Sequence, residues 1–316
     1  MFDPIKASKE IKDSYIDYIT TTFDMADTDY EREFRKELQT DGMVASGPFL
    51  DIGGSYETGH SLRELIQAQK ASVLFERLEP VAEKERELKL DRPLYQHQET
   101  AMLKAGKGEN LVVTTGTGSG KTESFLLPII NHLLREQEAG TLSAGVRAII
   151  IYPMNALAND QMKRMRALFK NYPQICYGVY NGNTEHTQSK ALAEYHRTYH
   201  DETGEPTDPA PNEIISREVM QERPPHILIT NYSMLEYMML RPKDDAVFSG
   251  AKLKFIVLDE AHIYKGATGM ETSLLMRRLR ARISEPDSVQ YILTSATLGG
   301  PDADGDILSF AEKLCG

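Results

Sequence analysis

The sequence predicts an α/β fold in which helices cover both faces of a parallel sheet, preceded by a helical N-terminal extension. From about residue 91 onward, short apolar runs alternate with longer stretches of helical periodicity. Strands that are apolar along their whole length are typical of a parallel sheet buried on both faces. Residues 1–90 instead show apolar side chains at helical spacing, over 5–23 and 61–78, with a Gly/Pro-rich loop at 47–54.

The order of the predicted elements supports three layers, because each strand is followed by a helix or a loop. Strands are expected at 111–114, 148–152, 176–180, 226–230, 255–258 and 291–294. Helices are expected at 121–137 and at 269–283. Another helix is expected to follow the strand 148–152 and end at 168, and a short one to follow the strand 226–230 and end at 240. Residues 184–224 are polar and contain several prolines, so we expect an insert between strands.

Length and composition exclude several classes of protein. The 316 residues are enough for about two domains, and 26% charged with 41% hydrophobic residues is ordinary for a globular chain. No apolar run reaches the roughly 18 residues of a membrane helix, and the N-terminus lacks the apolar stretch of a signal peptide. Cys176 and Cys315 show no metal or disulfide spacing. We therefore expect no membrane partner and a reducing, cytoplasmic location.

The net charge of −11 counts against a nucleic-acid partner, but its distribution weakens that argument. Residues 1–90 carry 19 acidic and 12 basic side chains, a net of −7. Residues 91–316 carry 28 and 24, a net of only −4. A local basic track in the second region is compatible with these numbers, so the net charge decides little.

The strongest functional signal is the run Thr115-Gly116-Thr117-Gly118-Ser119-Gly120-Lys121-Thr122, which lies between a predicted strand and a predicted helix. This is the context of a phosphate-binding loop. Glycines let successive N–H groups wrap an anion, and the helix start adds partial positive charge. Lys121 is expected to contact the β- and γ-phosphates, and the Thr122 hydroxyl to bind Mg²⁺. Thr115 stands where the general pattern has glycine.

A second signal is Asp259-Glu260-Ala261-His262, directly after the predicted strand 255–258. A carboxylate at a strand end can hold Mg²⁺ through water, and its neighbour can activate the attacking water. Alone, these letters also describe a surface acidic turn. A third segment, Ser295-Ala296-Thr297, follows the next strand, and its value is positional because Ser and Thr are common in turns.

In this order and spacing, the three segments resemble motifs I, II and III of the first RecA-like lobe of superfamily 2 DEAD/DEAH-box helicases. Residues 94–98 resemble the motif that reads adenine in this family, and residues 152–161 resemble motif Ia, which contacts the nucleic-acid backbone. Segments 180–184, 231–237 and 264–266 are similar to those of the large bacterial MrfA/YprA-like DNA helicases and of anti-phage relatives such as the Druantia helicase.

The resemblance implies a RecA-like P-loop domain with ATP and Mg²⁺ as cofactors, and it assigns roles to residues. The adenine and phosphates are expected to contact Gln98, Thr117, Gly118, Ser119, Gly120, Lys121 and Thr122. Catalysis is expected from Lys121 and Asp259 with Glu260 as base, and Mg²⁺ binding through water from Thr122 and Asp259. Coupling to nucleic acid is expected from His262, Ser295 and Thr297, and backbone contacts from Asn155 and Thr230.

The function predicted from these residues is that of the ATP-binding lobe of an ATP-dependent DNA helicase or translocase. Residues 1–90 would be a helical accessory region and 91–316 the lobe, with the insert at 184–224. A second RecA-like lobe, which would supply an arginine finger, is expected to be absent from the 316 residues, so ATP turnover by this chain alone should be weak. The alternatives are an RNA helicase and an ATP-gated nucleic-acid-binding module without unwinding.

Overall fold

The computed structural model describes residues 3–23, 25–47, 49, 56–78, 88–116, 118–201, 203–283, 288–296 and 304–316. The chain forms two compact units, Met1–Ser55 and Tyr56–Gly316, which are described separately. The sequence places the end of the N-terminal extension near residue 90, whereas the larger unit already begins at Tyr56. The reason is that Leu62, Leu65 and Phe75 are buried in the core of the larger unit.

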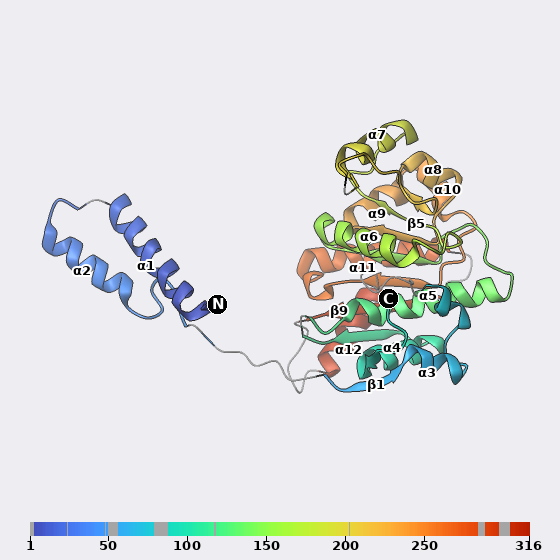
Figure 1. Cartoon of the computed structure of the whole chain (residues 1–316), viewed down its shortest axis with the longest axis horizontal. Coiled ribbons are helices and arrows are strands. Elements are labelled where there is room, and N and C mark those ends of the chain that lie inside the picture. The colour runs from blue at the N-terminus through green and yellow to red at the C-terminus, as the bar shows by residue number, and fades with distance from the viewer. Residues whose placement is uncertain are drawn as a thin grey trace. The chain divides into compact units, whose positions relative to one another are not determined.

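The first unit is a pair of helices, α1 (Pro4–Thr22) and α2 (Thr28–Gln39) (Figure 1). The carboxylates of Asp3 and Asp27 accept hydrogen bonds from the first backbone N–H groups of α1 and α2, respectively. Such caps satisfy donors that a helix cannot pair internally. Because α2 buries none of its residues, this unit has little core of its own.

The larger unit is built on a seven-stranded sheet in the order β3-β9-β8-β4-β7-β5-β6. Its strands are β3 (Leu111–Thr114), β4 (Ala148–Ile151), β5 (Tyr177–Tyr180), β6 (Glu213–Ile214), β7 (Ile227–Thr230), β8 (Phe255–Leu258) and β9 (Gln290–Ser295). All neighbouring strands pair in parallel, which confirms the predicted parallel sheet. The strand ends therefore define two edges, which we call the carboxyl edge and the amino edge.

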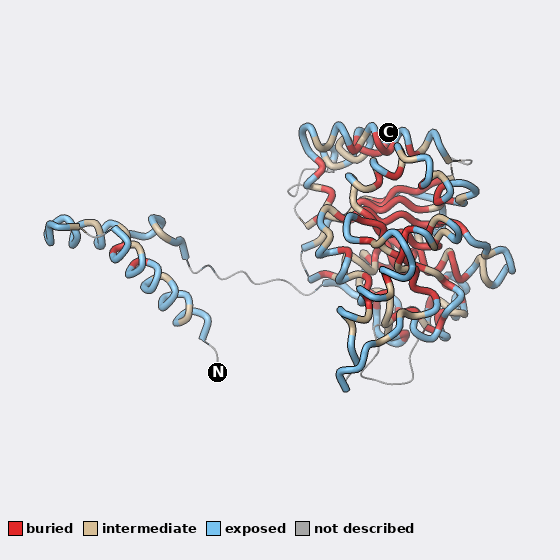
Figure 2. The backbone as a smooth tube through the Cα atoms, turned by 90° about the horizontal axis from the view of Figure 1, so that it is seen from above, coloured by how far each residue is buried: buried red, intermediate tan, exposed pale blue. Residues whose placement is uncertain are grey.

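Helices cover both faces of this sheet (Figure 1). Along β4, Ala148 and Ile150 belong to one core cluster and Ile149 and Ile151 to the other, as the alternation of a strand requires. The strands are the most deeply buried part of the unit (Figure 2). The first face carries α3 (Leu62–Gln67), α4 (Gln96–Gly106), α5 (Lys121–Glu138) and α6 (Asn155–Phe169). The second carries α8 (Arg217–Glu222), α9 (Tyr232–Leu240), α10 (Asp245–Phe248), α11 (Gly266–Arg282) and α12 (Asp304–Cys315).

The helix expected over 61–78 is in fact two pieces, α3 and the 3₁₀ helix η1 (Val73–Arg77). They are separated at Gln69, whose φ of 57° is left-handed and ends α3. A small antiparallel ribbon, β1 (Thr58–Ser61) with β2 (Pro93–Tyr95), was not predicted. Two more 3₁₀ turns are η3 (Pro242–Asp244) and η4 (Ala261–Ile263). The loop expected at 47–54 lies mostly outside the described residues.

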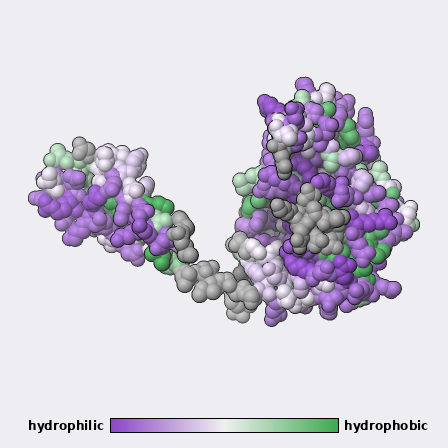
Figure 3. Space-filling view, in the orientation of Figure 1, coloured by the Kyte–Doolittle hydropathy of each residue, from purple (hydrophilic) through white to green (hydrophobic). Residues whose placement is uncertain are grey.

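The expected insert is an integral part of the sheet rather than an appendage. It contains α7 (Gln188–Thr198), and its strand β6 pairs with β5 to form one end of the sheet. Arg166 of α6 holds β6 through three hydrogen bonds to the Glu213 carboxylate, at 2.9 and 2.6 Å to Oε1 and 2.8 Å to Oε2. Its guanidinium lies 4.2 Å from the ring centre of Tyr199. The visible face of the larger unit is mostly hydrophilic (Figure 3), and no helix in the described part of the chain is long and apolar enough to cross a bilayer.

Candidate nucleotide-binding site

The predicted motifs meet at the carboxyl edge because β3, β9 and β8 are neighbours in the sheet. The phosphate loop follows β3, Ser295 ends β9, and Asp259 follows β8. Segments that are far apart in the sequence therefore lie close together in space. A crevice outside the carboxyl ends of the strands is where open α/β sheets bind their ligands.

The phosphate loop has the backbone shape that its glycines allow. Gly118 and Gly120 have φ values of 77° and 71°, and α5 begins directly after Gly120. Thr115, in the place of a glycine, uses its side chain: its hydroxyl lies 2.7 Å from the buried hydroxyl of Ser119. Lys121 Nζ donates to the Thr115 carbonyl at 3.3 Å, so the ammonium lies over the loop. Thr117 lies outside the described residues.

Gln98 lies against this loop but is buried, with 1% of its surface exposed. Its amide Nε2 donates to the Gly120 carbonyl at 2.9 Å, and its Oε1 accepts from the Tyr95 backbone N–H at 3.0 Å. Both ends of the amide therefore brace the backbone at the start of α5. Reading of adenine by Gln98 stays a prediction, since in this arrangement its polar atoms already have partners.

Three aromatic rings to which the motif analysis gave no role cluster beside the loop. The rings of Tyr56, Tyr95 and His97 have centroids 5.4 to 5.8 Å apart. His97 Nε2 donates to the Ser119 carbonyl at 3.0 Å, and a Cβ at Gly116 would lie 2.9 Å from the Tyr56 hydroxyl. Burial lowers the pKa of His97, which favours its neutral form. The concentration of Tyr and His around 94–98 was the available signal.

Asp259 is held in one orientation at the end of β8. Its Oδ1 accepts from the Thr294 hydroxyl of β9 and, at 3.0 Å, from the Glu260 backbone N–H. Burial raises the pKa of this carboxyl, while the Thr294 bond and the nearby Lys121 charge oppose the rise. In the described part of the chain Oδ2 has no hydrogen-bond partner, so a carboxylate oxygen is available to a cation near Lys121.

Two buried tyrosines flank Asp259 from the two core clusters. Tyr152 and Tyr264 are each 1% exposed, and neither hydroxyl has a hydrogen-bond partner among the described residues. Burial raises the pKa of both phenols, and the charge of Asp259 adds to the rise. The sequence around these tyrosines is apolar and did not predict that they lie beside the acidic motif.

His262 connects the acidic motif to the end of β9. Its Nδ1 lies 3.0 Å from the Ser295 hydroxyl and 3.3 Å from Glu260 Oε2. Glu260 itself has a φ of 49°, a left-handed conformation that is costly for a residue with a Cβ. The structure thus brings together His262 and Ser295, which were predicted to act in coupling. Thr297, the third, lies outside the described residues.

The loops after β4 and β7, expected to face nucleic acid, are tied to each other. Asn155 Oδ1 accepts from Asn231 Nδ2 at 2.9 Å, and Asn231 Oδ1 caps α9 through the Met234 N–H at 2.8 Å. Thr230 is 1% exposed, and its hydroxyl donates to the Tyr180 carbonyl at 2.7 Å. Thr230 therefore stabilises the sheet, and its contact with nucleic acid stays a prediction.

A phosphate loop and a pair of acidic residues at the carboxyl ends of β3 and β8, with only β9 between them, are typical of a nucleoside-triphosphate-binding lobe. Comparison with known proteins narrows the class. The family model described as DEAD/DEAH box helicase matches residues 95–202 and 200–304, and the chain belongs to this family.

Curated relatives agree with this assignment. The chain is 34% identical over 394 aligned residues to the Druantia protein DruE of Escherichia coli, which covers 98% of the chain and 21% of DruE. It is 30% identical to the uncharacterized ATP-dependent helicase YprA of Bacillus subtilis, over 68% of the chain and 24% of YprA. The chain therefore spans about a fifth to a quarter of these two proteins.

Solved structures show the same fold. The DUF1998 helicase MrfA, bound to DNA and AMPPNP, superposes with a TM-score of 0.56 at 23% identity, over 83% of this chain and 29% of MrfA. The DEAD-box helicase Mss116, bound to ssRNA and UDP-BeF, gives a TM-score of 0.60 at 18% identity, over 82% and 44%. The RecA-like fold predicted from the motifs is confirmed.

Proposed function

We propose that this chain is the ATP-binding lobe of an ATP-dependent DNA helicase or translocase. The observation that carries the proposal is the meeting of the phosphate loop, Asp259 and Glu260 at one sheet edge. His262 and Ser295 link that site to the end of β9, within the edge that also bears the Asn155–Asn231 loops. Since β4 is next to β8 in the sheet, coupling between the nucleotide and the loops expected to hold nucleic acid has to span only neighbouring strand ends.

In this proposal the residues of the chain divide the work of phosphoryl transfer. Lys121 and the N–H groups of the loop bind the phosphates, and the aromatic cluster of Tyr56, Tyr95 and His97 lies where a base can stack. Glu260 accepts the proton of the attacking water. The donor set of Thr122 and Asp259, a hydroxyl and a carboxylate, suits Mg²⁺, which neutralises charge on the phosphates when bound.

DNA is proposed as the substrate because MrfA is described as bound to DNA and aligns over most of this chain. RNA is the second candidate, favoured by the fold shared with ssRNA-bound Mss116. The relation to the Druantia protein supports a role in defence against phage. Cytoplasmic action fits two cysteines that are free thiols in the structure. The remaining length of the relatives leaves room for a second RecA-like lobe, which we propose as the partner of this one.

The proposal is tested by phosphate release from this chain and from the full-length protein, with and without single-stranded DNA or RNA. We expect the chain to bind ATP but to hydrolyse it about 10³–10⁵-fold more slowly than the full-length protein does. The reason is that an arginine from another lobe would supply that factor in rate. DNA-stimulated turnover with strand displacement identifies a helicase, and turnover without displacement a translocase. ATP-dependent DNA binding with no turnover in the full-length protein would establish the binding-module alternative instead.

A further inference from the structure

A strongly basic concavity lies at the amino edge of the sheet, opposite the nucleotide site. One cavity of about 450 Å³ is bordered by the ends of α4 and α5 and by the start of β8. A neighbouring cavity of about 490 Å³ shares His132 and Lys254 with it. We call the two together the basic trough. Its cations are Lys70, Lys107, Arg135, Lys252 and Lys254.

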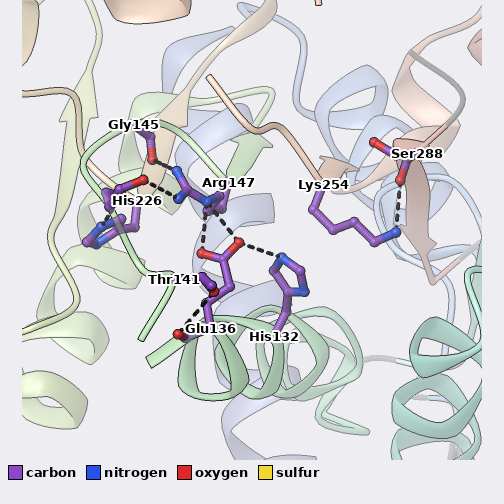
Figure 4. Close-up of polar contacts among 9 residues, drawn as sticks. His132, Glu136, Thr141, Gly145, Arg147, His226, Lys254 and Ser288 are labelled. Carbon is purple, nitrogen blue, oxygen red and sulfur yellow. Dashed lines mark hydrogen bonds and ion pairs between the residues drawn. The ribbon is translucent and has the colours of Figure 1, made fainter. Parts of the chain in front are cut away.

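Among the residues that the structure describes, the positive charge of the basic trough is largely uncompensated. Among the described lining residues of the first cavity there is no carboxylate. Glu136 lines the second, but Arg147, which is fully buried, binds its Oε2 at 3.0 Å, and His132 Nε2 lies 3.5 Å from its Oε1 (Figure 4). Glu99 lies close enough to Lys70 for that cation to help lower its pKa. In a chain of net charge −11, such a group of cations makes a local positive potential that attracts anions.

Two of the five cations, Arg135 and Lys254, are positioned by neutral carbonyl groups, which orient them without cancelling their charge. Lys254 Nζ donates to the Ser288 carbonyl at 2.9 Å (Figure 4). Arg135 donates to the Gln69 carbonyl at 2.9 Å. Gln69 is one of the non-glycine residues with positive φ, and the turn that it makes delivers Lys70 to the rim. Backbone strain of this kind occurs more often at functional positions than elsewhere.

The lining indicates which chemistry the trough can recognise. Its floor is apolar, with Met102, Leu103 and Pro128. The aromatic ring of Phe255 is only 2% exposed, and the ring of His132 packs edge-on against it and lies 3.5 Å from Glu136. The described lining therefore offers no row of free aromatic rings of the kind that holds single-stranded bases. Cations without a base-reading surface suit the phosphodiester backbone, which is contacted independently of sequence.

We propose that the basic trough binds the phosphate backbone of a second segment of nucleic acid, apart from the segment at the carboxyl edge. This rests on the proposed function as a nucleic-acid motor. Lys254 precedes β8 and Asp259 follows it, so the trough and the carboxyl edge are separated by five residue steps of a strand, roughly 17 Å. A branched substrate, such as a fork, can occupy both sites at once.

The test uses a trough variant in which Lys70, Lys107 and Arg135 are all replaced by Gln. These side chains are exposed, so their replacement should leave the fold intact. A matched control replaces the exposed Lys9, Lys36 and Lys190 by Gln and gives the same change in net charge. A charge-retaining variant carries Lys70→Arg, Lys107→Arg and Arg135→Lys. Thermal unfolding and ATP calorimetry check that each variant folds and binds nucleotide.

Binding of labelled forked and single-stranded DNA is measured by fluorescence anisotropy over a range of salt concentrations. Three lost phosphate contacts should make the log–log salt slope for the fork shallower by about 2 to 3, and should weaken binding at least about tenfold at 0.1 M salt. The matched control and the charge-retaining variant should behave like the parent chain, and single-stranded DNA should be affected less than the fork.

Several outcomes would overturn the inference. Unchanged fork affinity in the trough variant would remove the trough from DNA binding, and an equal loss in the charge-retaining variant would mean a structural role. Direct binding of labelled polyglutamate that is lost only in the trough variant, with fork binding unchanged, would identify an acidic peptide as the ligand. The motor function itself is judged separately, from DNA-stimulated ATP turnover of the full-length protein, so either conclusion can fail without the other.

Discussion

Replacing Gln98 by Ala separates the two roles that this residue can have. In the structure its amide satisfies the Gly120 carbonyl and the Tyr95 N–H in a site that is 1% exposed. Each backbone group left unpaired in a buried site costs about 1–3 kcal/mol, so we expect the chain to lose roughly 2–6 kcal/mol of unfolding free energy. For a unit of this size that lowers the midpoint of thermal unfolding by at least about 4 °C.

The assay is thermal unfolding without nucleotide, followed by calorimetric titration with ATP and GTP. If Gln98 braces the phosphate loop, both nucleotides should lose affinity by a similar factor, and the midpoint should fall before any nucleotide is added. The matched control is Gln96→Ala, an exposed position at the start of the same helix, where the midpoint should hardly change. If the midpoint did not change and affinity fell for ATP but not for GTP, the bracing role would be refuted, and Gln98 would instead be the residue that recognises adenine.

Three further predictions concern the residues at the strand ends. Lys121→Ala should weaken ATP binding about 10- to 150-fold, because a charge-assisted contact worth about 1.5–3 kcal/mol is lost; equal affinity by calorimetry would remove Lys121 from the site. Glu260→Gln should keep ATP binding while phosphate release by the full-length protein collapses, since the amide cannot take a proton; normal turnover would disprove its role as base. Asp259→Asn should raise the unfolding midpoint of the nucleotide-free chain at pH 7. Burial raises the pKa of Asp259, so folding favours its protonated form, and the ionised form costs stability that builds up as pH rises from the unfolded pKa through the folded one. The gain should therefore shrink as the pH is lowered toward 4, and a gain independent of pH would contradict this account.

Much of the larger unit could be predicted because its central strands are short, apolar runs that are buried along their whole length. Phe255–Leu258 matches the predicted strand, and β4 ends one residue earlier than expected. The split of the helix over 61–78 could not be seen, because Leu62, Leu65 and Phe75 all face the same core on either side of the turn. The two-residue strand β6 carries no periodic signal, and only its pairing with β5 defines it.

The site could be predicted where function resides in adjacent residues, as in the phosphate loop and Asp259–Glu260. It could not be predicted where the interaction joins distant positions. Thr294 and Asp259 are 35 residues apart, and Gln98 and Gly120 are 22 apart. Thr230 seemed available for binding because it ends a strand, yet its position in the sheet turns the hydroxyl toward Tyr180. Such choices are made by tertiary packing, which a motif does not contain.

The strand β6 has a consequence for the solubility of the whole lobe. A terminal strand of a sheet presents a row of unpaired backbone groups on which another chain can template itself. Here β5 is shielded by a partner only two residues long, which Arg166 fastens through Glu213. A two-residue strand offers too few backbone hydrogen bonds to pair stably with another molecule, so the polar segment around it protects the sheet against self-association. Trimming that segment from a shortened lobe would expose β5 and invite aggregation before any effect on ATP was seen.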